Sequence, residues 1–427
     1  MKKLRRALAF IMTVAMLAGI TAFAAPADDV DMITVSLRIE GIKESLYYNA
    51  ALRIPAGSSV ADLIKQVSGT GGAPKITITE STYGAYVSEI GGLAEFAYGE
   101  MSGWNYRVNN VEPSFGIGQY KLVDKDSAVI FYGDPFGVGM QHPAADWSRL
   151  LSEGIITFSS TDTVYGPDWT PTLVERPVAG AKVLFRWDDY VTNDKGEIKV
   201  FDKTGLAGFR ALQIERYDEK TGVPTVLRFA PGYEIFVPFA DTITEAGPAW
   251  YDEAVRFCVR EEYFIGTDFA ANLFAPMRKM TMAQLVAVLF RIAGSDVDAS
   301  MGEQWYVEPL IWAVANKILD VDEDVVKEGI GPLFELTSGM NVTREEFIHM
   351  FYLTAKLVGG GYDMTVAADI TRATDFKEIK GSYVEAISWA VASGIIRGTN
   401  LNELTISPKV EVNRVTVCQM LYNYYNS

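Results

Sequence analysis

Apolar and polar residues alternate along the first part of the chain. Between residues 32 and 136 several short runs alternate, among them Ile33–Ile39, which predicts strands with one exposed face. The run Ser58–Val67 has helical spacing behind a serine, which predicts a short capped helix. The pair Asn109-Asn110 between apolar residues predicts a two-residue hairpin turn, because asparagine tolerates positive φ. We therefore expect a β-rich α+β domain over 32–136.

Residues 150–237 again carry strand-like runs, among them "PVAGAKVLFRW" and "GFRALQIERY". Their Gly-Ala-x-Val pattern resembles that of carboxypeptidase-regulatory-like and other immunoglobulin-like surface modules, which usually act as spacers between domains. The resemblance implies an immunoglobulin-like β-sandwich for this segment.

The hydrophobic period changes to a helical one in the C-terminal part, where one unit occurs three times. The first helices of the copies start at Trp250, Trp305 and Ser382. The second helices start behind the N-cap residues Thr281, Thr343 and Asn413. Gln284 and Glu346 stand three residues after their caps, which predicts a capping box in two of the copies. We therefore expect three pairs of helices.

These copies resemble the S-layer homology (SLH) family, with repeats at 238–295, 296–358 and 370–427. The resemblance rests on a Phe-x-Asp-like lead-in ("FAD" at Phe239, a degenerate "FKE" at Phe376), a Trp-Tyr helix, a glycine turn (Gly266, Gly398) and a Thr-Arg-Ala-Glu-like second helix. It implies an all-α pseudo-threefold bundle of three SLH repeats.

The resemblance also implies a partner, an anionic secondary cell-wall polysaccharide bound in grooves between the repeats. A helix start attracts anions, and an arginine in the first turn adds a directional donor. The implied binding residues are Arg344, Arg414, Thr343, Glu346, Trp250 and Trp305, the tryptophans as platforms for sugar rings. Repeat one departs from the pattern with Met282 at the arginine position, and repeat two has Val321 and a longer loop at the glycine turn. We therefore expect at most two full-strength grooves.

The N-terminal part contains a second motif. The spacing Trp104-x-Tyr106-x-Val108-Asn109, followed by Tyr120-x-Leu122-x-Asp124, resembles the DUF4430 family. That family's fold is similar to the C-terminal β-domain of transcobalamin and intrinsic factor, which implies a β-grasp-like domain. The resemblance implies a corrinoid such as cobalamin as candidate ligand, with Trp104, Tyr106, Asn109 and Asn110 near the contact surface. The alternative is that Trp104 and Tyr106 are core residues of a small domain.

Composition and charge indicate where the protein acts and which partners are disfavoured. The first 25 residues have a basic start, an apolar run and Ala22-Phe23-Ala24, which is typical of a cleaved signal peptide on the general secretory or the twin-arginine route. Cleavage removes four positive charges and takes the formal net charge from −16 to −20. Nucleic acid and anionic membranes repel so acidic a chain, and no later apolar run is long enough to span a bilayer.

The inventory of reactive residues is small. The 427 residues include two cysteines, Cys258 and Cys418, and two histidines, so we expect neither a metal site nor a catalytic site. Each cysteine occupies a small apolar position of the repeat and is read as a buried hydrophobe, with a disulfide between them left as the alternative.

These observations favour an exported, non-catalytic protein of the cell wall or S-layer surface, held by SLH repeats and displaying a ligand-binding β-domain. The alternative is a structural S-layer or adhesion protein without a small-molecule ligand. A wall-attached enzyme is a third class, but neither a nucleophile elbow nor metal-ligand spacing supports it. The sequence does not decide the oligomeric state.

Overall fold

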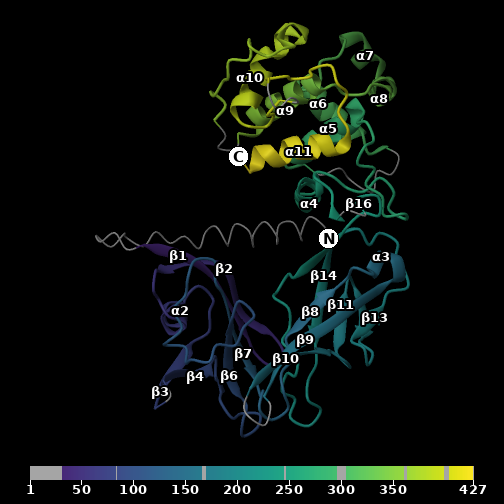
Figure 1. The fold of residues 1–427 in the computed structure, drawn as a ribbon. Coiled ribbons are helices and arrows are strands. Elements are labelled where there is room, and N and C mark those ends of the chain that lie inside the picture. The colour runs from purple at the N-terminus through teal and green to yellow at the C-terminus, as the bar shows by residue number, and fades with distance from the viewer. Residues whose placement is uncertain are drawn as a thin grey trace. The chain divides into compact units, whose positions relative to one another are not determined.

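The computed structural model describes residues 31–82, 84–165, 170–244, 247–295, 304–359, 363–398 and 403–426. The signal peptide expected at 1–25 lies outside this part. The chain forms two compact units: the residues up to Asp202 with Arg210–Ile235, and Lys203–Phe209 with Phe236–Ser427. The first is rich in strands and the second in helices (Figure 1), which confirms the expected multidomain chain with a β-rich N-terminal and a helical C-terminal region.

The first half of the β-rich unit contains a mixed four-stranded sheet. Its elements are β1 (Met32–Glu40), β2 (Ser45–Pro55), α2 (Val60–Val67), β3 (Ile76–Ser81), β4 (Gly84–Ile90), β5 (Leu93–Ala94), β6 (Gly103–Val108) and β7 (Ser127–Gly133). The sheet order is β2-β1-β7-β6, in which β1 pairs antiparallel with β2 and parallel with β7. Strands β3, β4 and β5 form a second, smaller sheet.

Helix α2 starts where the sequence predicts. The Ser59 side chain accepts from the Asp62 backbone N–H, and the Asp62 carboxylate accepts from the Ser59 N–H at 2.8 Å, which completes a capping box. Val60, Leu63 and Ile64 are fully buried and pack with Leu37 and Ile39 of β1 in one core. The alternation along β1 therefore produces its buried face as expected.

The second half of the β-rich unit contains two further four-stranded sheets, ordered β10-β9-β13 with β8 on β9, and β12-β11-β14-β15. The elements are β8 (Pro143–Asp146), α3 (Leu150–Glu153), β9 (Ile155–Tyr165), β10 (Pro171–Pro177), β11 (Lys182–Phe185), β12 (Asp188–Val191), β13 (Glu197–Lys199), β14 (Gly208–Glu215) and β15 (Glu234–Val237). The immunoglobulin-like assignment of this part stays a prediction.

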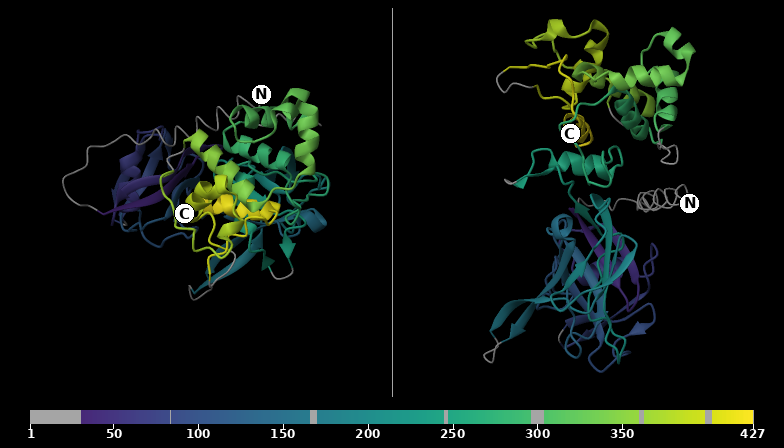
Figure 2. Two further views of the ribbon diagram at one scale, coloured as in Figure 1. Left: turned by 90° about the horizontal axis from the view of Figure 1, so that it is seen from above. Right: turned by 90° about the vertical axis from the view of Figure 1, so that its right-hand side faces the viewer.

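The helical unit has the three expected helix pairs. The first helices are α4 (Asp252–Arg260), α6 (Val307–Ala315) and α10 (Val384–Ala392), and the second helices are α5 (Met282–Ile292), α9 (Arg344–Val358) and α11 (Arg414–Tyr425). Shorter elements are β16 (Ile243–Thr244), β17 (Gly247–Pro248), α7 (Glu323–Glu328), α8 (Ile330–Gly339), η2 (Phe376–Glu378) and η3 (Gly381–Tyr383). Figure 2 shows these helices, coloured from teal through green to yellow, from two further sides.

A closed ring of backbone hydrogen bonds joins the three pairs. The N–H of Met280 donates to Val412 O at 3.1 Å, Val412 N–H to Val342 O at 2.9 Å, and Val342 N–H to Met280 O at 2.9 Å. All three residues are buried. The first helix of each copy also packs on the second helix of another, as α6 on α5, α10 on α9 and α4 on α11. The last copy therefore closes on the first, although the SLH assignment itself stays a prediction.

The structure changes two details of the repeat alignment. The longer loop expected in the second copy contains two helices, α7 and α8, and Asp322 caps the first of them. The Asp241 carboxylate accepts the N–H groups of Phe274 and Ala275, and Asp375 does the same for Ile406 and Ser407. Asp375 rather than the "FKE" at Phe376 is therefore the counterpart of the "FAD" aspartate.

Candidate functional site

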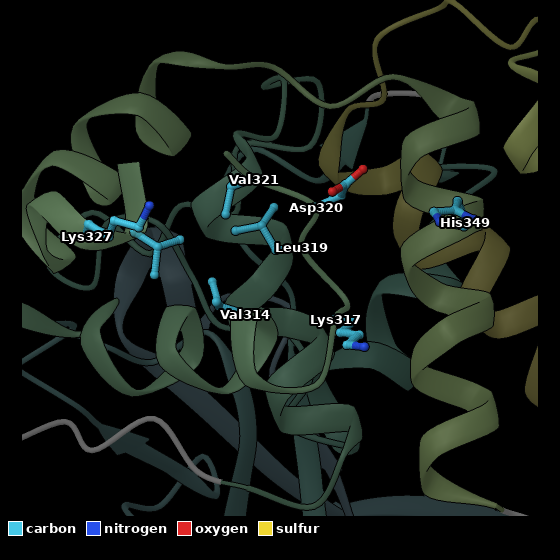
Figure 3. Close-up of a pocket in the computed structure, with 8 residues that line it drawn as sticks. Val314, Lys317, Leu319, Asp320, Val321, Lys327 and His349 are labelled. Carbon is cyan, nitrogen blue, oxygen red and sulfur yellow. The ribbon is translucent and has the colours of Figure 1, made fainter. Parts of the chain in front are cut away.

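A cavity of about 640 Å³ opens in the helical unit beside the second copy. Its walls come from the end of α6, the turn after it, α7 and α9. The lining residues are Val314, Lys317, Leu319, Asp320, Val321, Val326, Lys327 and His349. In Figure 3 Lys327 and His349 approach from opposite sides, with Asp320 and Lys317 between them. The polar lining is therefore mainly nitrogen.

The cationic groups of this cavity differ in how far they are already paired. Lys317 is exposed and has no ion-pair partner within the described residues, whereas Lys327 pairs with Asp324 at 2.9 Å. Burial and the nearby Lys380 lower the pKa of His349, against the opposing effect of Asp320. Its imidazole is therefore mainly neutral at pH 7, and its Nδ1 is buried with no partner in the described part of the chain. The exposed Lys317 ammonium is therefore the donor that this cavity offers to an anion, and the Asp320 carboxylate lies in the same lining.

Arg414, one of the predicted polysaccharide contacts, is engaged inside the protein. Its Nε donates to Phe274 O at 2.7 Å and its Nη2 to Ile265 O at 2.6 Å. The guanidinium carbon lies 4.5 Å from the Phe274 ring centroid and 4.9 Å from that of Phe264. The residue is 8% exposed, and burial lowers its pKa to about 10, so it stays charged at neutral pH. This arginine ties the third copy to the first.

Arg344 occupies the corresponding position in the second copy. Its backbone N–H donates to Val410 O at 2.9 Å. Burial lowers its pKa, and the charge of Asp375 opposes that shift. Its Nε is buried without a hydrogen-bond partner among the described residues. Unlike Arg414, this arginine therefore has an unused donor.

The four other predicted polysaccharide contacts differ in their exposure and in their partners. Thr343 Oγ1 and Glu346 Oε2 lie 2.7 Å apart in the capping box of α9 and satisfy each other. Trp305 is half-buried and packs edge-on against Phe334 at a centroid distance of 6.0 Å. Trp250 is 67% exposed and presents most of its ring to solvent. Of these four residues, Trp250 is the one available as a sugar platform.

The candidate corrinoid contacts on β6 are packed into their own domain. The Trp104 indole Nε1 donates to Leu93 O at 2.9 Å, and its ring meets Tyr132 edge-on at 5.2 Å. The Tyr106 hydroxyl donates to Phe115 O, and burial raises the pKa of Tyr106 to about 12. Both aromatic residues are half-buried against the core that includes α2.

The hairpin turn after β6 forms as predicted. Asn109 and Asn110 have φ values of 52° and 64°, and Val108 and Val111 exchange hydrogen bonds across them. The Asn109 amide also donates to Asp126 Oδ1 at 2.7 Å, and its Oδ1 accepts from Ser127 N–H at 2.9 Å. The side chain of Asn109 therefore fixes the turn.

An exposed aromatic loop between β5 and β6 was not foreseen from the sequence. Phe96, Tyr98 and Met101 are 60%, 38% and 54% exposed, and Phe96 has a φ of 63°, which is rare for an aromatic residue. Phe136, 81% exposed, follows β7. Only the clustering of aromatics around Gly99 could have drawn attention to the segment.

The described residues contain neither a cluster of metal ligands nor a membrane-spanning helix. No group of three or more His, Cys, Asp or Glu side chains there is arranged to hold a metal ion. Within the same ranges no helix has the length and apolar character needed to cross a membrane.

Comparison with known proteins bears mainly on the first half of the β-rich unit. Residues 60–133 match the family model described as "Domain of unknown function (DUF4430)". This match confirms the DUF4430 domain predicted from the Trp104 motif. It covers less than a fifth of the chain and carries no function of its own. No curated protein matches the chain.

Solved structures show weaker likeness. One is haptocorrin in complex with Cbi, at 17% identity and a TM-score of 0.23, covering 26% of this chain and 27% of that one. Another is a protein of Ruminococcus gnavus ATCC 29149 described as a candidate metal-binding protein, at 7% identity and a TM-score of 0.19. The second likeness covers 24% of this chain and 97% of that one. This chain thus spans about a quarter of the length of haptocorrin.

Proposed function

We propose that the protein is an exported, non-catalytic cell-surface protein. Its helical unit binds an anionic secondary cell-wall polysaccharide, and its β-rich unit displays a ligand-binding domain. The observation that carries the wall-binding part is the closed ring of three helix pairs with a nitrogen-lined cavity beside the second copy. The SLH resemblance suggested this function, and the cavity supplies the chemistry for it.

The chemistry of the cavity suits a carboxylate-bearing glycan. Lys317 supplies an exposed positive charge with no ion-pair partner among the described residues, and His349 and Asp320 line the same cavity. A sugar ring brings both a carboxylate for the lysine and an apolar face for an aromatic residue. Trp250, on the first copy, is a separate exposed aromatic surface and is not among the residues that line this cavity. Arg414 contributes indirectly, because it holds the copies together.

Co-sedimentation of the full chain with purified cell walls that retain their anionic polymer tests this function. Lys317→Gln removes the positive charge and keeps a polar side chain, and we expect about tenfold weaker binding. The matched control is Lys195→Gln, an exposed lysine on a turn of the β-rich unit. Equal binding of both variants and the parent would exclude the cavity as the wall-binding site.

The second function that an observation favours is capture of a corrinoid by the β-rich unit. The DUF4430 match at 60–133 and the exposed loop with Phe96, Tyr98 and Met101 support it. A corrin ring is large and flat, and aromatic side chains held on a rigid loop suit such a surface. Trp104 packs on Tyr132, which holds this loop, whereas the Tyr106 hydroxyl donates to Phe115 O.

A spectral titration of the full chain with cobalamin and with cobinamide tests this function. Phe96→Asn removes the exposed ring and keeps the backbone, because asparagine tolerates the positive φ at this position. Phe201→Asn is the matched control, since Phe201 is 86% exposed elsewhere on the same unit. A saturable absorbance shift weakened by Phe96→Asn alone is expected. No shift at high protein concentration would favour the alternative of a structural S-layer or adhesion protein.

A further inference from the structure

The two cysteines of the chain meet at one helix contact. Cys258 lies on α4 and Cys418 on α11, 160 residues later, and both thiols are free and fully buried. Cys258 Sγ is 3.7 Å from the Cys418 carbonyl oxygen. Burial raises the pKa of the Cys258 thiol, and the adjacent Cys418 side chain raises it further. Both cysteines therefore lie in the same dry helix contact.

The repeat shows how unusual this pair is. At the position of Cys258 the other copies have Ala313 and Ala390, and at that of Cys418 they have Val286 and Ile348. The contacts of α6 with α5 and of α10 with α9 therefore combine an alanine with a β-branched residue. Only the contact of α4 with α11 has cysteine at both positions, and the sequence contains no other cysteine.

A covalent bond would stabilise the helical unit most at this contact. Helix α5 leads directly into the copy that begins with α6, and α9 into the copy that begins with α10. The contact between α4 and α11 instead joins the first copy to the last. A cross-link there closes a loop of about 160 residues, and in the chain-entropy model long loops give the largest stabilisation.

We propose that Cys258 and Cys418 form a disulfide that closes the ring of three helix pairs covalently. A low-molecular-weight or protein disulfide is the oxidant. One cysteine thiolate attacks this disulfide and releases one thiol, and the second thiolate attacks the resulting mixed disulfide and releases the other. The two cysteines lose two protons and two electrons, and the oxidant is reduced to two thiols.

Burial of the two thiols in the folded unit determines when the disulfide can form. In the folded unit both thiols are shielded, and the Cys258 thiolate is disfavoured, so exchange is slow. Oxidation therefore accompanies folding, before α11 docks on α4, and the finished disulfide is shielded from reductants. The inference rests on the proposed function only for export, which brings the folding chain to an oxidising compartment.

The test is refolding of the full chain in glutathione disulfide with glutathione, and separately in reductant. Each sample is then denatured in an alkylating agent and analysed by mass spectrometry. The oxidised sample is expected to contain the linked 258–418 peptide pair and no alkylated cysteine, and to melt about 5 to 15 °C higher than the reduced one. Alkylation of both cysteines after oxidative refolding, or linkage only between chains, would overturn the proposal.

A variant that lacks both cysteines serves as the control. Cys258→Ala with Cys418→Val introduces the residue types that the other copies have at these positions. It is expected to fold like the reduced protein and to melt at the same temperature in both buffers. A melting shift that persists in this variant would also overturn the proposal. The thiol count does not depend on wall binding, so failure of the wall assay leaves this result intact.

Discussion

The carboxylate of Glu40 accepts two hydrogen bonds from Arg228, at 2.8 Å from Nη2 and 3.2 Å from Nε, although 188 residues separate them. The side chains are 3% and 14% exposed. Arg228 also donates to the carbonyls of Gly41 and Ile42, and Arg38 donates to Arg228 O at 2.7 Å. Both nitrogens donate to Oε2 of Glu40, and this ion pair joins β1 to the chain segment before β15. The two halves of the β-rich unit are therefore linked by buried charge.

Arg228→Met is expected to lower the unfolding free energy of the β-rich unit by about 1.5 to 3 kcal/mol, because the buried Glu40 carboxylate loses its hydrogen bonds from Arg228 and keeps those from Arg38 and Ser45. The double variant Arg38→Met with Arg228→Met removes both guanidinium partners of this carboxylate and is expected to lose more than the single one. Urea unfolding measures both. Arg149→Met is the control, since its pair with Glu197 is partly exposed and contributes at most about 1 kcal/mol. Equal losses for Arg228→Met and Arg149→Met would contradict the assignment.

Arg414→Ala is expected to destabilise the helical unit by about 2 to 4 kcal/mol, because the carbonyls of Phe274 and Ile265 lose a charged donor. Thermal unfolding of the full chain measures this loss. Arg397→Ala is the control, because Arg397 is exposed and should change stability by less than about 0.5 kcal/mol. An Arg414→Ala protein that melts normally but no longer sediments with cell walls would show that this arginine contacts ligand instead.

Local sequence patterns predicted the features that depend on neighbouring residues. The capping boxes at Thr281 and Thr343 and the Asn109-Asn110 turn form as expected, because each involves residues at most three positions apart. The helical period also gave the three helix pairs. In these features the side chains of neighbouring residues determine the local backbone conformation.

Long-range packing decided the features that the sequence did not reveal. The arginine motif predicts a charged group at a helix start, but the carbonyls that hold Arg414 lie 140 and 149 residues away. The positive φ of Phe96 likewise occurs in a loop held by Tyr132, which follows 36 positions later. The periodicity of a sequence does not reveal contacts between residues so far apart. The cavity beside His349 also depends on such long-range contacts.

The capping box of α2 makes the stability of the β-rich unit depend on pH. Hydrogen bonds from the backbone and hydroxyl of Ser59 lower the pKa of Asp62 below its usual value near 3.8. The folded state therefore binds the proton less readily than the unfolded state, so this stabilisation is present above the unfolded pKa and is lost as pH falls through the folded pKa.

Asp62→Asn is accordingly expected to cost stability at pH 7 and little at pH 2.5, as urea unfolding at both values would show. Glu219→Gln is the matched control, since Glu219 is exposed on the turn after β14. A loss for Asp62→Asn of the same size at both pH values would count against the carboxylate as the cause.

The Tyr132 hydroxyl is expected to set the rigidity of the aromatic loop. It accepts from Ala97 N–H at 3.1 Å, donates to Ala94 O at 3.1 Å and lies 3.0 Å from Ser102 Oγ, and the residue is 1% exposed. Tyr132→Phe removes these hydrogen bonds, and each typically contributes about 0.5 to 1.5 kcal/mol. The loop that presents Phe96 should then open more often.

Amide hydrogen exchange of residues 94–102 in the full chain measures this opening. Faster exchange is expected at Ala97, whose N–H loses its acceptor, while α2 keeps its protection. Tyr120→Phe is the control, because the Tyr120 hydroxyl has no hydrogen-bond partner among the residues that the structure describes. If Tyr132→Phe left exchange at Ala97 unchanged, the loop would be held by other contacts. Corrinoid binding by a preformed Phe96 surface would then need a different explanation for its rigidity.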